Sequence, residues 1–141
     1  MLIEYVFGGI HAIEFLYVSD PKYLKRTGPN HYRTTSRTKL VLLLSNAESI
    51  KKYKSINCVL LTSEVRHGIY VPKGTAGLNS DSYIQPREIY TIDKKNFKNK
   101  IGDLPQHYLT KVYLDLLYTL NFDYMQQFIF PDSFKGNNNL L

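Results

Sequence analysis

Short apolar runs separated by turn residues are the feature that most constrains the fold of this chain. The runs are LIEYVF, IHAIEFLYV, KLVLLLS, INCVLLTS, GIYV, SYIQ and EIYTI, and they are rich in β-branched and aromatic residues. The segments at residues 40–44 and 57–61 are almost continuously apolar, which is typical of central strands covered on both faces. The pattern therefore predicts a small curled sheet or barrel built from short strands.

Two segments carry helical signals. NAESIKKY begins with Asn46, a residue type that often caps a helix, so we expect a short connecting helix there. Past Pro105, whose fixed backbone angle suits a first helical turn, apolar residues recur at helical spacing. They are Leu109, Val112, Tyr113, Leu116, Leu117 and Leu120. We expect an amphipathic C-terminal helix packed on the sheet, and hence a β-rich α+β fold.

Length, charge and cysteine content limit the remaining possibilities. With 141 residues the chain has the length of one domain, which we expect at residues 1–130, followed by a mobile tail at 131–141. The formal charge of +6 favours an anionic partner. Cys58 is the single cysteine and has apolar neighbours, which predicts a buried thiol. No run approaches the ~18 apolar residues of a spanning helix and no signal-peptide layout is present, so we expect a cytoplasmic protein without membrane contact.

The connection from about Val18 to Thr38 is long for a small domain, and such connections are usually functional or disordered. It has no acidic residue after Asp20. Its cations, interleaved with Tyr23 and Tyr32, suit a nucleic-acid strand, because cations contact phosphates and aromatic faces stack on bases. A solvated loop without a ligand is the alternative, and the sequence leaves both open. The basic residues up to the next strand are Lys22, Lys25, Arg26, Arg33, Arg37 and Lys39.

The order of motifs resembles the MazF/PemK/Kid family of toxins. After the basic loop come TKLVLLLSN, CVLLTSE, GLNSDSYI and IYTIDKKNFKNKIGDL, and then the final helix. The best stretch, Gly77 to Leu120, follows the family pattern GL..dS.v....i.tidk.r....iG.L, and the resemblance covers roughly Gly9 to Leu120. It implies an SH3-like barrel of the MazF/CcdB type. In that fold TIDKKNFKNKIG links the last strand to the helix, and its lysines form a solvated face.

The family resemblance implies an activity and partners. Most members cleave single-stranded RNA without a metal or cofactor, so the chain is expected to be a sequence-selective endoribonuclease toxin, an mRNA interferase, neutralised by a cognate antitoxin peptide. A homodimer is also implied. Two alternatives stay open: a catalytically silent relative that binds nucleic acid or an antitoxin-like peptide, and a gyrase-directed toxin of the CcdB type, against which the TIDK tract argues. The dimer would cover helix tyrosines, namely Tyr108, Tyr113 and Tyr118.

The resemblance also selects catalytic residues. Thr62 and Ser63 match the Thr-Ser pair that ends a family strand, and His31 is the counterpart of a loop histidine. The family's Arg-Pro element is altered, so Arg37 and Lys39 compete for its arginine position. Metal-free RNA cleavage needs a base for the 2′-hydroxyl, an acid for the departing 5′-oxygen and donors on the phosphate. We therefore expect His31 to act as base or acid and Arg37, Thr62 and Ser63 to stabilise the phosphate.

Other titratable residues receive weaker assignments. Gln85 and Arg87 stand where some members carry Arg and Asp, so that version of the acid–base pair is absent. His11 and His107 are expected to be packing or surface residues, and His67 lies in a turn. No cluster has metal-ligand spacing, and no cofactor is expected. The residues predicted to bind RNA are Lys25, Arg26, Arg33, Lys39 and Arg87.

Overall fold

The structure, a computed structural model, describes residues 3–16, 24–28, 31–34 and 36–121. Within the strands, the side chains of residues 15–16, 24–28, 31–34 and 36–37 are not described. The predicted tail at 131–141 lies outside the described residues, so it stays a prediction together with the domain boundary at residue 130. In chain order the elements are β1 (Gly9–Leu16), β2 (Leu24–Gly28), β3 (His31–Thr34), β4 (Ser36–Leu43), α1 (Ala47–Lys52), β5 (Ser55–Thr62), β6 (Ile69–Val71), η2 (Thr75–Gly77), β7 (Ser82–Asp93), η3 (Lys94–Asn96), β8 (Phe97–Asp103) and α2 (Gln106–Thr119).

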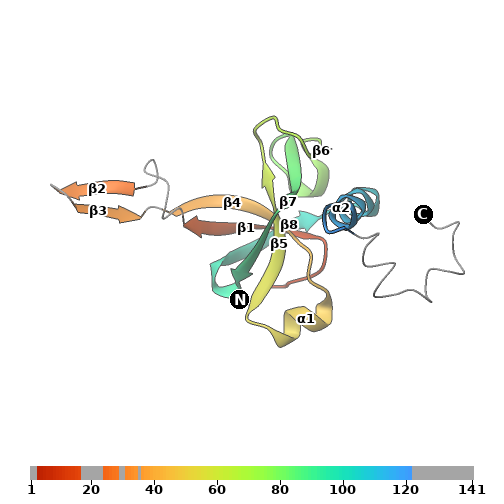
Figure 1. Ribbon diagram of the computed structural model, residues 1–141, viewed down its shortest axis with the longest axis horizontal. Helices are drawn as coiled ribbons and strands as arrows, with labels where there is room; N and C mark the ends of the chain where they lie inside the picture. Colours follow the sequence, from red (N-terminus) through yellow and green to blue (C-terminus); the bar gives the residue numbers. More distant parts are fainter. Residues whose placement is uncertain (1–2, 17–23, 29–30, 35, 122–141) are drawn as a thin grey trace, which may run out of the picture.

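Six antiparallel strands form one curled sheet in the order β6-β7-β5-β4-β1-β8, with α2 packed at its side (Figure 1). The two apolar segments of the sequence became β4 and β5, the central strands, as predicted. Alternate residues of these strands enter different cores: Leu42 belongs to one cluster, whereas Val41 and Leu43 belong to the other. Burial on both faces therefore explains why these segments are almost continuously apolar.

Two apolar clusters hold the sheet together. The first lies under α2, where Val112 and Leu116 pack against residues of β1, β4, β5, β6 and β7. The second gathers residues of β1, β4, β5, α1 and β8, and includes Phe97 and the buried thiol of Cys58. Leu120, predicted to pack, is 56% exposed, because it follows the last residue of α2. The other predicted contact residues of the helix are buried or half-buried.

The predicted long basic loop contains a β-hairpin. β2 and β3 pair antiparallel, with Lys25 opposite Arg33, and form a separate two-stranded sheet beyond the ends of β1 and β4 (Figure 1). The segment expected to be a loop therefore contains two strands, and the structure does not decide between an RNA-binding role and a loop without a ligand. Thr27 in β2 and Tyr32 and Thr34 in β3 are residue types that favour strands, which helps to explain the pairing.

Three other assignments need correction. Residues 3–6, predicted as part of a first strand, are not in a strand. SYIQ and EIYTI are one strand, β7, interrupted by a bulge at Pro86, Arg87 and Glu88. Proline lacks a backbone N–H, so it fits a position without a ladder hydrogen bond. The lysine-rich stretch is not merely a link, because Phe97–Asp103 forms β8 against β1.

The helix ends follow the sequence signals closely. Asn46 caps α1, and its Oδ1 accepts a hydrogen bond from the backbone N–H of Ser49 at 2.8 Å. Pro105 is the N-cap of α2 and so lies one position before the predicted first turn. No helix within the described residues is long and apolar enough to cross a membrane.

Candidate functional site

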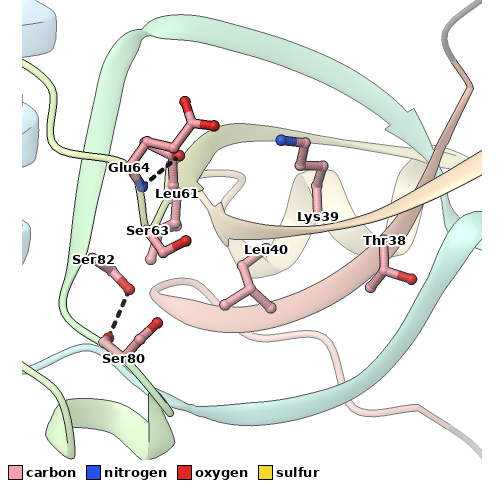
Figure 2. A pocket seen from close by; sticks show the side chains of 9 residues that line it. Thr38, Lys39, Leu40, Leu61, Ser63, Glu64, Ser80 and Ser82 are labelled. Carbon is pink, nitrogen blue, oxygen red and sulfur yellow. Dashed lines mark hydrogen bonds between the residues drawn. The ribbon is translucent and has the colours of Figure 1, made fainter. Parts of the chain in front are cut away.

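The first half of β4, the end of β5 and the start of β7 surround a polar pocket of about 180 Å³. The sheet register explains the arrangement: Leu40 lies opposite Leu61 in the β4–β5 ladder, and Thr62 lies opposite Tyr83 of β7. We call it the hydroxyl pocket, because five of the nine lining residues carry a hydroxyl group. The described residues that line it are Thr38, Lys39, Leu40, Leu61, Thr62, Ser63, Glu64, Ser80 and Ser82 (Figure 2).

Two hydrogen bonds fix the walls of the hydroxyl pocket. The backbone N–H of Glu64 donates to Oγ1 of Thr62 at 3.2 Å, and Oγ of Ser82 donates to the carbonyl oxygen of Ser80 at 3.0 Å (Figure 2). Thr62 and Ser82 are both buried. Because the Thr62 oxygen accepts the backbone hydrogen bond, its own O–H can still donate to a ligand.

Two opposite charges lie at one end of the pocket. In Figure 2 the amino group of Lys39 and the carboxylate of Glu64 lie on the same side of the pocket, away from Ser80 and Ser82. Arg66 Nη2 lies 3.0 Å from Oε2 of Glu64, and its Nη1 lies 3.6 Å from Oε1 of Glu88. The guanidinium of Arg66 thus connects the pocket carboxylate to β7. The pocket therefore combines a cation, an anion and several hydroxyl donors.

A second hollow, of about 390 Å³, lies against His67 and Gly68, further along the connection between β5 and β6. Gly68 has φ +144°, and a Cβ there would lie 2.4 Å from the carbonyl oxygen of Ile84, so glycine lets the connection pack closely on β7. Arg87 comes from the bulge of β7 and Asp115 from α2. The described residues that line this second hollow are His67, Gly68, Gln85, Pro86, Arg87 and Asp115.

The structure brings together only part of the predicted site. Thr62 and Ser63 line the hydroxyl pocket together with Lys39, whereas Arg87 lines the second hollow. His31 begins β3 and Arg37 lies in β4, two residues before Lys39. The side chains of His31 and Arg37 lie outside the described residues, as do those of the predicted RNA-binding residues of the hairpin, Lys25, Arg26 and Arg33. Their roles stay predictions.

Cys58, His11 and His107 do not line the hydroxyl pocket. Burial raises the pKa of Cys58 to about 12, so this thiol stays protonated and is a poor nucleophile. His11 is fully buried and His107 is exposed, as predicted for packing and surface residues. Within residues 3–16, 24–28, 31–34 and 36–121, no group of three or more His, Cys, Asp or Glu could hold a metal ion.

The sheet, the C-terminal helix and the pocket between the strands define a small β-rich α+β domain. The sequence profile described as PemK-like, MazF-like toxin of type II toxin-antitoxin system matches residues 23–120. The chain belongs to this family, which confirms the resemblance identified from the GLNSDSYI and TIDK tracts. No curated protein matches the chain in sequence.

Solved structures confirm the predicted fold class. An endoribonuclease in complex with its cognate antitoxin from Mycobacterial species has 18% identity and a TM-score of 0.58, with 84% of this chain and 96% of that chain covered. A chain of the MazE-MazF structure (Form-II) from Deinococcus radiodurans has 14% identity and a TM-score of 0.62, with 83% of this chain and 96% of that chain covered. MazF (Form-I) from the same organism has 17% identity and a TM-score of 0.57, with 84% and 99% covered.

Sequence reasoning missed several residues of the hydroxyl pocket. Ser80 and Ser82 belong to the GLNSDSYI tract, which was used for its resemblance and not for its chemistry. Glu64 directly follows the Thr-Ser pair, so its position after a strand end was a signal that could have been used. Arg66 could not be linked to Glu64 and Glu88 by spacing alone, because the contact with Glu88 depends on the register of β7.

Proposed function

We propose that this toxin is a metal-independent endoribonuclease that cleaves single-stranded RNA at the hydroxyl pocket. One observation carries the proposal: in a chain of the MazF-like toxin family, β4 and the end of β5 place Lys39 in one pocket with Thr62 and Ser63. The likeness to structures of endoribonucleases supports the same activity. The charge of +6 suits a polyanionic substrate.

The pocket residues match the needs of phosphate chemistry. When the 2′-oxygen of RNA attacks the adjacent phosphate, negative charge accumulates on the non-bridging oxygens, and fixed donors that contact those oxygens lower the barrier. The hydroxyls of Thr62 and Ser63 are such donors, and Lys39 supplies a positive charge beside them. We keep Arg37 as the competing cation of β4 and His31 as an acid or base, both on the family resemblance.

RNA binding extends beyond the pocket in this proposal. The β2–β3 hairpin carries Lys25 and Arg26 on one strand and Arg33 on the other, and Arg87 lies in the second hollow. Basic residues of this kind bind phosphates and position the strand without reading its sequence. Because cleavage of cellular RNA requires contact with it, we assign the activity to the cytoplasm.

Two partners follow from the family and from its solved relatives. The Mycobacterial endoribonuclease was solved with its cognate antitoxin, and we propose that an antitoxin peptide also restrains this chain. We further propose a homodimer that covers the outer face of α2, where Leu114 and Tyr118 are 62% and 80% exposed. Tyr113 is not part of that face, because its hydroxyl donates to the carbonyl oxygen of Leu44 at 3.0 Å. Light scattering should give twice the mass of one chain.

The test of the activity is cleavage of a mixed-sequence single-stranded RNA transcript in EDTA, with single-stranded DNA of the same sequence as control. RNA should be cut and DNA spared, because DNA lacks the 2′-hydroxyl nucleophile. The products should carry a 2′,3′-cyclic phosphate and a 5′-hydroxyl. RNA that stays intact at high protein concentration would favour the alternative of a catalytically silent binder.

A further inference from the structure

We infer that Glu64 is the general base that takes the proton of the attacking 2′-hydroxyl. The inference rests on the proposed RNA cleavage and adds a role that the sequence resemblance did not assign. Metal-free cleavage requires a group with an accessible lone pair near the 2′-oxygen. Among the described residues that line the hydroxyl pocket, Glu64 is the one carboxylate, and the other polar groups are hydroxyls or the amino group of Lys39.

The local backbone keeps Glu64 at the hydroxyl pocket. The backbone N–H of Glu64 donates to Oγ1 of Thr62, so the chain bends directly after β5 and keeps residue 64 beside the strand end. The carboxylate lies on the same side of the pocket as the amino group of Lys39 (Figure 2). A phosphate held by Lys39 and Thr62 would thus have its neighbouring 2′-hydroxyl near this carboxylate.

Arg66 gives the carboxylate a defined position. Its guanidinium lies 3.0 Å from Oε2 of Glu64 and 3.6 Å from Oε1 of Glu88, so it joins an exposed loop residue to β7. The Glu64 side chain is 67% exposed, so much of its surface faces solvent. Because exposed ion pairs contribute little to stability, the value of this arrangement lies in orientation. Arg66 is therefore a positioning residue.

The step balances without a co-reactant. The 2′-oxygen forms a bond to phosphorus while its proton passes to the Glu64 carboxylate. The bond between phosphorus and the 5′-oxygen breaks, and the departing oxygen keeps the electron pair and takes a proton from solvent water. The product is a 2′,3′-cyclic phosphate and a 5′-hydroxyl end, and Glu64 then returns its proton to solvent.

The experiment compares Glu64→Gln with the parent. The amide keeps the size of the side chain and can still bind Arg66, but it cannot accept the proton. We expect turnover of a single-stranded RNA in EDTA to fall by on the order of 10²-fold or more. The parent should also lose activity in acid as carboxylates take up protons, and this acid limb should be absent from the residual activity of Glu64→Gln. Glu64→Asp should keep the limb with intermediate turnover.

Two further measurements separate a base from a merely structural residue. Glu48→Gln removes an exposed carboxylate of α1 and should cleave within a few-fold of the parent, since a group outside the hydroxyl pocket touches no reacting atom. An RNA with a 2′-O-methyl group at the nucleotide where the parent cuts lacks the attacking hydroxyl and should stay intact. Glu64→Gln and the parent should bind this RNA with the same affinity. Turnover of Glu64→Gln near that of the parent, or an unchanged acid limb, would overturn the inference alone. An inactive parent would overturn the proposed function, and the inference with it.

Discussion

The hydroxyl pocket and the second hollow share one connection, yet they are built from different kinds of structure. The hydroxyl pocket lies along β4 and beside the end of β5 and the start of β7, so the ladder of the sheet fixes Lys39 and Thr62, and Glu64 follows two residues after β5. The second hollow combines a loop residue, His67, with the bulge of β7 and with Asp115 of α2. Rigid strand ends suit groups that must contact reacting atoms within a few tenths of an ångström. We therefore assign chemistry to the first region and strand positioning to the second.

The largest expected effect concerns a hydroxyl of the first region. Thr62→Val removes the Oγ1 donor but keeps the branched shape of a strand residue. Turnover should fall on the order of 10²-fold, as it does when one donor to a developing oxyanion is removed. Thr91→Val is the matched control, because Thr91 is exposed and bonds Asn57 away from the pocket. RNA cleavage rates at saturating substrate measure both. Equal rates for Thr62→Val and the parent would move the chemistry out of this pocket.

A smaller effect is expected for the residue that links the two regions. Arg66→Ala leaves Glu64 in place but removes its anchor to β7, so turnover should fall about 10-fold, through looser positioning. The acid limb of the pH profile should remain, since the carboxylate itself is retained. Loss of that limb in Arg66→Ala would show that the guanidinium does more than position Glu64.

The weakest effects on RNA concern single phosphate contacts, one in each region. Lys39→Ala and Arg87→Ala should each reduce the slope of log affinity against log salt by about 0.7, the value per contact for a single strand. Turnover at saturating RNA should survive in Arg87→Ala. Binding to the 2′-O-methyl RNA over a salt series provides the slopes. An unchanged slope for Arg87→Ala would show that the RNA does not contact Arg87, and the second hollow would then have no role in RNA binding.

The sequence predicted the parts of this comparison that depend on local signals. Thr62 and Ser63 follow one apolar run of the sequence and Lys39 precedes another, and the family resemblance assigned all three to one site. The Asn46 cap and the central position of β4 and β5 were likewise readable from residue types and periodicity. These features need only the chain on either side of them.

Features that depend on strand register could not be predicted in the same way. β8 was missed because its exposed lysines obscure the strand pattern that starts at the buried Phe97. The β2–β3 hairpin was missed because charged residues dominate it. Three residues of β7, between Gln85 and Ile89, have no partner in the β5–β7 ladder. This bulge places Arg87 in the lining of the second hollow. The division between the two hollows is therefore a tertiary property.

The last prediction separates acid loss of chemistry from acid loss of folding, and it depends on His11. This side chain is fully buried, and Nδ1 lies 2.8 Å from the carbonyl oxygen of Lys98, so Nδ1 carries the proton and donates. Nε2 has no hydrogen-bond partner among the described residues. Burial lowers the pKa of His11 from 6.5, against the raising effect of the Lys98 carbonyl; Lys100 lowers it further and Asp103 raises it.

The sign of the pH effect follows from that lowered pKa. Below about pH 6.5 the unfolded chain binds a proton at this imidazole while the folded chain does not. The contribution of His11 to the free energy of unfolding is therefore greatest above that pH and decreases below it. Urea unfolding at pH 7.5 and pH 5 should show the decrease in the parent and in His107→Gln, whose exposed imidazole is a control. His11→Asn, which keeps a donor for the Lys98 carbonyl but cannot titrate, should be less stable at both pH values and lose this contribution. Because Glu64→Gln keeps His11, it should unfold with the same pH dependence as the parent, so a difference between their activity profiles in acid reports on chemistry and not on folding.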